Sequence, residues 1–122
     1  MKEDILNYVT KEDYEKGRYF PSHYIKLINK SSEKSSDVLY TFRVKSEYTN
    51  RYYTTQFHTH LNKIKDVFCS CPQFYTYDSC KHISACLINN QELFYDTNDP
   101  KNIESKSNYI FFSFFLWIKI LH

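Results

Sequence analysis

Residues 67–88 read VFCSCPQFYTYDSCKHISACLI and hold all four cysteines of the 122-residue chain. Two cysteines are separated by one residue. After eight further residues comes a third cysteine, which is separated from a histidine by one residue. Thiolate sulfur and imidazole nitrogen are the ligands that zinc takes in four-coordinate structural sites. The stretch therefore predicts one tetrahedral zinc site whose ligands are Cys69, Cys71, Cys80 and His82.

The residues around this stretch predict how the ligands converge. Side chains two apart on a strand point to the same side, so Cys69 and Cys71 reach one ion where a strand over residues 63–68 ends. Cys80 opens a helix over residues 80–90, where free backbone N–H groups favour a thiolate. Four protein ligands leave no position for a reactive water, so we expect a structural zinc ion and no enzyme activity.

Other roles for these cysteines and histidines stay open from the sequence. The clustered cysteines could form a labile disulfide or serve as buried apolar residues. Cys86 lies four residues after His82 and is either a fifth candidate ligand or a small core residue, which its apolar neighbours favour. His58 and His60 could hold a second metal ion, but with no acidic or cysteine companion beside them we interpret them as exposed strand histidines.

Chain length and composition limit the class of protein. The chain is long enough for one domain with a modest core, and its net charge of +2 gives only a weak electrostatic preference for a polyanion. The first thirty residues show no secretory signal pattern, so we expect a cytoplasmic location. A reducing compartment favours metal binding over disulfides for grouped cysteines.

The first 16 residues have a rough helical spacing of apolar side chains. Thr10 followed by Asp13 resembles a capping box and predicts a helix start, and Gly17 is expected to end that helix in the left-handed conformation. From residue 22 to 68 the pattern changes to short alternations that predict strands over residues 23–29, 38–45, 51–61 and 63–68, with polar turns at 30–37 and 46–50. The predicted fold is α+β: an N-terminal helix, an antiparallel β-meander of about four strands and a zinc-binding hairpin that leads into a helix, within residues 1–95.

The remainder of the chain differs in composition. Residues 96–108 are polar and predict a linker, and residues 109–122 form an almost wholly apolar, aromatic tail. The apolar run is too short to cross a bilayer as a helix, so a membrane role is disfavoured. The tail could pack on the protein, lie at a membrane interface, bind a partner or be the aberrant end of a truncated or frame-shifted reading frame.

The run CSCPQFYTYDSCKHISACLI at residues 69–88 resembles a SWIM-type zinc finger. The match includes the proline after the second cysteine, the lysine between Cys80 and His82, and an Ile-x-Ala pattern that starts at Ile83. The segment before it is similar to the N-terminal region of bacterial SWI/SNF-type helicase-like ATPases. The resemblance implies the same four ligands, but the single glycine leaves no room for a phosphate-binding loop, so motor activity is not carried over.

Two classes of binding partner follow from the residues near the predicted zinc site. Lysines and aromatic side chains could contact phosphates and stack on bases, which favours DNA or another nucleic acid as the partner. The same exposed aromatics, in a predicted loop over residues 73–77, could dock on a protein, such as a separately encoded helicase-like subunit. The candidate contact residues are Lys63, Lys65, Phe74, Tyr75, Tyr77 and Lys81.

Overall fold

A computed structural model describes residues 1–34 and 36–95 of the chain, and it confirms the expected α+β fold. Lys2–Asn90 form one compact unit, and among the described residues Met1 and residues 91–95 are grouped apart from it. The predicted linker at 96–108 and the apolar tail at 109–122 lie outside the described residues. None of the helices in the described part of the chain is long and apolar enough to span a membrane.

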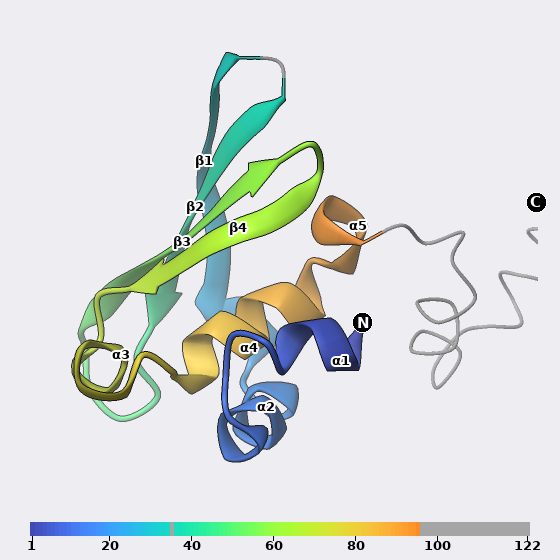
Figure 1. Ribbon diagram of the computed structural model, residues 1–122. Coiled ribbons are helices and arrows are strands. Elements are labelled where there is room, and N and C mark those ends of the chain that lie inside the picture. The colour runs from blue at the N-terminus through green and yellow to red at the C-terminus, as the bar shows by residue number, and fades with distance from the viewer. Residues whose placement is uncertain (35, 96–122) are drawn as a thin grey trace, which may run out of the picture. The chain divides into compact units, whose positions relative to one another are not determined.

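The sheet is an antiparallel meander in which the strand order follows the sequence (Figure 1). Its strands are β1 (Ile25–Lys34), β2 (Asp37–Lys45), β3 (Tyr52–His60) and β4 (Lys63–Cys69). The prediction of a polar turn over residues 30–37 was wrong, because β1 continues to Lys34, which pairs with Asp37. Pairing of Lys30, Ser31 and Lys34 with β2 holds this segment extended. The exposed polar side chains of Lys30, Ser31, Ser32 and Lys34 carry no alternation that a sequence pattern could detect.

The two central strands bury one face and expose the other, as their alternation predicts. On β2 the buried residues are Tyr40, Phe42 and Val44, and on β3 they are Thr55, Phe57 and Thr59. The rings of Phe42 and Phe57 meet edge to face with centroids 5.7 Å apart. This face of the sheet supplies the core on which the helices pack.

Two helices from opposite ends of the unit meet beside the sheet. Helix α4 (Lys81–Asn89) contacts β3 and β4, and helix α2 (Lys11–Arg18) packs against α4 (Figure 1). Ile83, Ala85, Cys86 and Leu87 of α4 are fully buried. The remaining helices are short: α1 (Lys2–Ile5), the 3-10 turn η1 (Ser22–Tyr24), α3 (Pro72–Tyr77) and α5 (Gln91–Phe94).

The sequence predicts the start of α2 correctly, but it predicts the wrong role for the glycine in this helix. Thr10 is the N-cap, and its hydroxyl accepts a hydrogen bond from the Asp13 N–H at 3.1 Å. The prediction of a left-handed cap at Gly17 was wrong, because Gly17 lies within the helix and has no positive φ. A Cβ atom at this position would lie 2.0 Å from Ser84 Oγ, so the glycine is needed for the close approach of α2 to α4.

Candidate metal centre

The first ligand pair lies where the last strand gives way to a short helix. Cys69 is the final residue of β4, and Cys71 is the N-cap of α3. Pro72 occupies the first turn of α3, where its fixed φ fits a helix start and its missing N–H costs nothing. The prediction of a loop over residues 73–77 was therefore wrong, because this segment is helical.

The second ligand pair lies at the start of α4. Cys80 is the N-cap of this helix and His82 is its second residue, so both side chains emerge from the first turn. The residue between α3 and Ser79 is Asp78, which adopts the left-handed conformation (φ 55°) that turns the chain back. The strand end and the helix start thus face each other, as the spacing of the ligands predicts.

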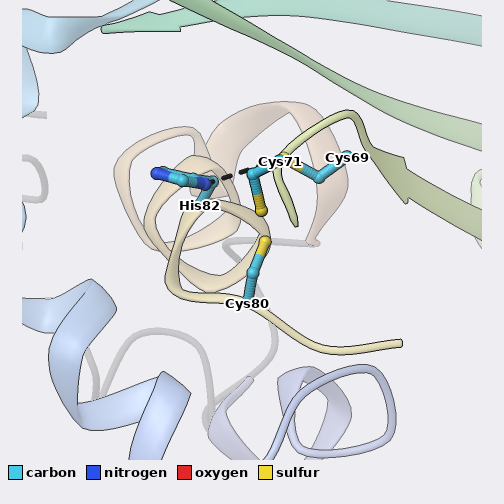
Figure 2. A group of neighbouring side chains, drawn as sticks. All are labelled: Cys69, Cys71, Cys80 and His82. Atoms are coloured by element: carbon cyan, nitrogen blue, oxygen red, sulfur yellow. Dashed lines mark hydrogen bonds between the residues drawn. The ribbon is translucent and has the colours of Figure 1, made fainter. Parts of the chain in front are cut away.

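The four ligand atoms are close enough to share one ion. All of them lie within 4.8 Å of one another, and all four residues are buried. Zinc bond lengths at a tetrahedral angle require ligand atoms roughly 3.6 to 3.8 Å apart, and Cys69 Sγ lies 3.6 Å from His82 Nδ1. Figure 2 shows the Cys71 and Cys80 side chains pointing toward each other, with a dashed line from His82 to Cys69. The residues present therefore fit a tetrahedral metal ion.

Neighbouring side chains hold the ligands in this geometry. The hydroxyl of Thr55 on β3 donates to Cys69 Sγ at 3.4 Å. The imidazole of His82 contacts two aromatic rings, with centroid distances of 5.5 Å to Phe20 and 5.3 Å to Tyr53. These contacts restrict the rotation of the ligands, as outer-sphere partners of metal sites commonly do.

The three thiols compete for ionisation when no cation is present. Hydrogen bonds from Cys69 and Cys80 hold the pKa of Cys71 well below its usual range. The hydrogen bond to Cys71 raises the pKa of Cys69 to about 11. The pKa of Cys80 is also raised, by its contacts with Cys69 and Cys71. Because one thiolate suppresses the next, three thiolates would coexist here only beside a bound cation.

Cys86 does not join the ligand set. It is fully buried on α4 and lies outside the group of four converging residues, and all four cysteines of the chain are free thiols. Burial raises the pKa of its thiol well above the ordinary value. Cys86 is therefore the small core residue that its apolar neighbours favour.

Asp13 links the metal centre to α2, a role that its place in a capping motif does not reveal. Its buried carboxylate accepts hydrogen bonds from Ser79 Oγ at 2.6 Å and from Gln73 Nε2 at 3.0 Å. Both donors belong to the segment between Cys71 and Cys80. Ser84 Oγ on α4 also donates to the backbone carbonyl of Asp13 at 2.8 Å. One aspartate thus fixes the segment that carries the two ligand pairs.

The candidate contact residues do not form one patch. Lys63 and Lys65 are exposed near the start of β4, whereas α3 follows the end of that strand, roughly 20 Å away for a strand of this length. Tyr75 and Tyr77 on α3 are 82% and 71% exposed. Phe74 is half-buried and packs edge to face on Phe68, with centroids 5.9 Å apart.

Lys81 is occupied by partners within the protein. Its ammonium group lies 2.6 Å from the Glu47 carboxylate, and the two side chains are only 20% and 24% exposed. The same group lies 4.9 Å from the Tyr48 ring centroid and 5.9 Å from that of Phe20. Lys81 therefore anchors the loop before β3 beside the metal centre.

Comparison with protein-family models, with curated proteins and with solved structures found no match for this chain. The chemistry of the site therefore rests on its own residues. What they establish is a buried Cys3His group whose ligand atoms lie close enough together to hold a metal ion.

Proposed function

We propose that this protein is a zinc-binding module in which Cys69, Cys71, Cys80 and His82 hold one structural Zn²⁺. The observation that carries this proposal is the convergence of four buried ligand atoms within 4.8 Å. Three thiolates and one imidazole match the ligand preference of zinc, and four protein ligands leave no position for a water. The ion is thus structural, and the module has no catalytic activity. A reducing, cytoplasmic compartment suits it because zinc thiolates require reduced cysteines.

Native mass spectrometry tests the metal assignment. The wild-type chain is expected to carry one tightly held zinc ion, and Cys80→Ser is expected to lose it because one of four ligands is removed. Cys86→Ala is the matched control, since it changes a buried cysteine on the same helix outside the ligand group. A wild-type chain without tightly bound metal, or a Cys80→Ser chain that retains it, would contradict the assignment.

The order of elements supports the proposed relation to SWIM-type fingers. A strand ends in Cys-x-Cys, and Cys-x-His opens a helix that packs on the sheet. The segment between the two ligand pairs contains a short helix, α3, that has no buried residue. Modules of that kind bind nucleic acids or proteins, so a partner of either class is consistent with the resemblance.

We favour a nucleic acid as the partner because one exposed cation and one exposed aromatic ring lie together on the sheet, and further exposed cations and rings lie elsewhere on the surface. The guanidinium of Arg43 lies 5.0 Å from the ring centroid of Tyr52, and both side chains are exposed on the outer face of the sheet. Lys63 and Lys65 add positive charge on β4, and Tyr75 and Tyr77 offer rings on α3. Cationic side chains neutralise phosphates, and rings stack on unpaired bases.

Fluorescence anisotropy with labelled single-stranded and duplex oligonucleotides tests this proposal. Binding is expected at low salt and should weaken steeply as salt rises, because counterions are released from the phosphates. Replacing Arg43 and Tyr52 together by alanine should weaken binding. Lys11→Ala and Lys16→Ala serve as controls, because they also remove positive charge from exposed positions, in this case on α2. Absence of binding at low salt, or equal losses in both sets of variants, would argue against the interface.

A protein partner is the second candidate, and α3 is the feature that favours it. Tyr75 and Tyr77 are largely exposed on one short helix, and Lys81 beside the centre is already neutralised by Glu47. Exposed tyrosines with little net charge are typical of protein interfaces. A pull-down with and without nuclease separates the two classes, because a protein contact survives nuclease and a contact bridged by nucleic acid does not.

A further inference from the structure

A second group of metal-ligating side chains lies at the end of β3 that is remote from the Cys3His group. His58 and His60 are two residues apart on the outer face of β3. In the sheet register His60 stands opposite Asp37 of β2, and His58 stands opposite Asp66 of β4. The sheet thus supplies both histidines with the acidic companions that are absent from their own segment of the sequence.

Both imidazoles converge on a single carboxylate oxygen. His60 Nδ1 lies 2.6 Å from Asp37 Oδ1, and His58 Nε2 lies 3.7 Å from the same oxygen. The other ring nitrogen of His58, Nδ1, lies 3.5 Å from Asp66 Oδ2. His58 is therefore placed between two carboxylates, with one nitrogen directed toward each.

This arrangement leaves one interaction of a neutral His58 unfavourable. A neutral imidazole has one N–H donor and one bare nitrogen, so it can donate to only one of the two aspartates. If Nδ1–H faces Asp66, the lone pair of Nε2 faces the negatively charged Asp37 Oδ1, and the two atoms repel each other. A cation between His58 Nε2, His60 Nδ1 and Asp37 removes that repulsion, and Asp66 then fixes the ring as the outer carboxylate of a carboxylate–histidine–metal chain.

We propose that His58, His60 and Asp37 form a second, exposed binding site for a divalent transition-metal ion such as Zn²⁺, with Asp66 as a positioning residue. Two imidazoles and a carboxylate suit zinc, nickel and copper. Zinc requires ligand atoms roughly 3.3 Å apart. On zinc binding the distance from Asp37 Oδ1 to His60 Nδ1 therefore lengthens slightly, and the distance from Asp37 Oδ1 to His58 Nε2 shortens. The three ligand side chains are 40%, 42% and 32% exposed, which leaves room for this rotation and for water on the ion.

The site is weaker than the Cys3His group for two reasons. It offers three ligands and no thiolate, and its side chains keep their contact with solvent. Lys34 also interacts with Asp37, and Lys63 stands opposite His60, so nearby positive charge opposes a cation. Zinc at this site is therefore expected to exchange readily and to be removed by a mild chelator that leaves the Cys3His group filled.

Calorimetric titration with Zn²⁺ tests the site in the full chain. The protein is first given one equivalent of zinc, and further Zn²⁺ is then added. The wild type should bind one additional zinc ion per chain. His60→Ala should lose this event, and Asp66→Asn should weaken it by roughly tenfold or more, as loss of an outer-sphere partner does.

His23→Ala provides the matched control, because His23 is exposed but stands apart from the group on η1. It should bind the additional zinc as the wild type does. Asp37→Asn is a near-isosteric second test if His60→Ala perturbs folding, which circular dichroism reports. The zinc taken up over both additions is summed, so the difference between variants does not depend on the Cys3His group being filled. Equal total uptake by wild type, His60→Ala and Asp37→Asn would overturn the proposal.

Discussion

Gly17 illustrates how a single residue sets the distance between two helices. Its missing side chain allows α2 to approach α4 so closely that a Cβ atom would lie 2.0 Å from Ser84 Oγ and 2.9 Å from the Ala85 nitrogen. The hydroxyl can turn away only by giving up its hydrogen bond to the Asp13 carbonyl, and the backbone nitrogen cannot turn away. The sequence marks this position as special through its only glycine, yet the same residue would serve a turn equally well.

Gly17→Ala is therefore expected to lower the free energy of unfolding by about 1 to 3 kcal/mol, the usual cost of overpacking. Chemical denaturation followed by circular dichroism measures this. Adding Ser84→Ala should recover only part of the loss, because the clash with the Ala85 nitrogen remains. An unchanged unfolding midpoint for Gly17→Ala would show that α2 and α4 are not held this tightly.

Cys86 is a second single residue with a measurable effect, in this case at alkaline pH. Burial raises the pKa of its thiol above the ordinary value of 9.0 in the folded state. As the pH rises above that value, the unfolded chain releases the proton while the folded chain keeps it, so stability falls by up to about 1.4 kcal/mol per pH unit. Unfolding curves of the zinc-loaded protein at pH 8 and pH 10 measure this loss.

Cys86→Ala should lack this part of the alkaline loss, although its stability at neutral pH is lowered by the small cavity. The comparison is between the pH dependences of the two proteins and not between their absolute stabilities. Identical pH dependences would mean that Cys86 is accessible to solvent in the folded state.

At the scale of elements, the segment between the ligand pairs is held from two sides. Its flanking candidate ligands belong to β4 and α4, and Asp13 ties it to α2 through Ser79 and Gln73. Burying a carboxylate costs little free energy when several donors bond to it. Separating the carboxylate from those donors leaves buried polar groups unpaired and costs a great deal. Helix α2 thus helps to support the candidate metal centre.

Asp13→Ala should destabilise the fold by about 1 to 3 kcal/mol, because buried donors lose their acceptor. Asp13→Ala should also speed the transfer of zinc to a competing chelator, because α3 and Ser79 lose the hydrogen bonds that hold them to α2. Absorbance of a colorimetric chelator over time reports this rate. Glu12→Ala, one residue away and exposed, is the control and should leave both quantities near the wild-type values.

At the scale of the whole molecule, the candidate metal centre joins the sheet to the helices. The ligands belong to the end of β4, the start of α3 and the start of α4, and α4 in turn contacts α2. A structural zinc site in a small domain contributes roughly 10 kcal/mol of apparent folding free energy, which is comparable with the whole stability of such a domain. Folding and metal binding are therefore expected to be coupled.

Removal of zinc with a strong chelator should lower the thermal unfolding midpoint sharply and reduce the helical signal in circular dichroism. Helix α4 is expected to detach first, because Cys80 and His82 occupy its first turn. Restoring one equivalent of Zn²⁺ should recover both signals, whereas Mg²⁺, which prefers oxygen ligands, should not. Identical melting curves before and after chelation would contradict the coupling.

The sequence alone determined the features that depend on local spacing. The Cys-x-Cys and Cys-x-His pairs predicted the four residues that converge in the structure, two-residue alternation predicted the buried faces of β2 and β3, and Thr10 predicted the start of α2. Each of these signals arises within a few residues, where the geometry of a strand or of a helix end fixes which side chains share a direction. That is why the strands and the four converging residues could be predicted, while the full length of β1 and the helix α3, which lack a clear period, could not.

Only the tertiary structure decided the contacts between distant segments. It placed Ser84 against Gly17, Ser79 and Gln73 on Asp13, Glu47 on Lys81, and the two aspartates beside His58 and His60. These partners are separated in the sequence by turns and by whole strands, so no periodicity links them. They meet because sheet register and helix packing bring their elements together, and the choice of register depends on the buried core as a whole.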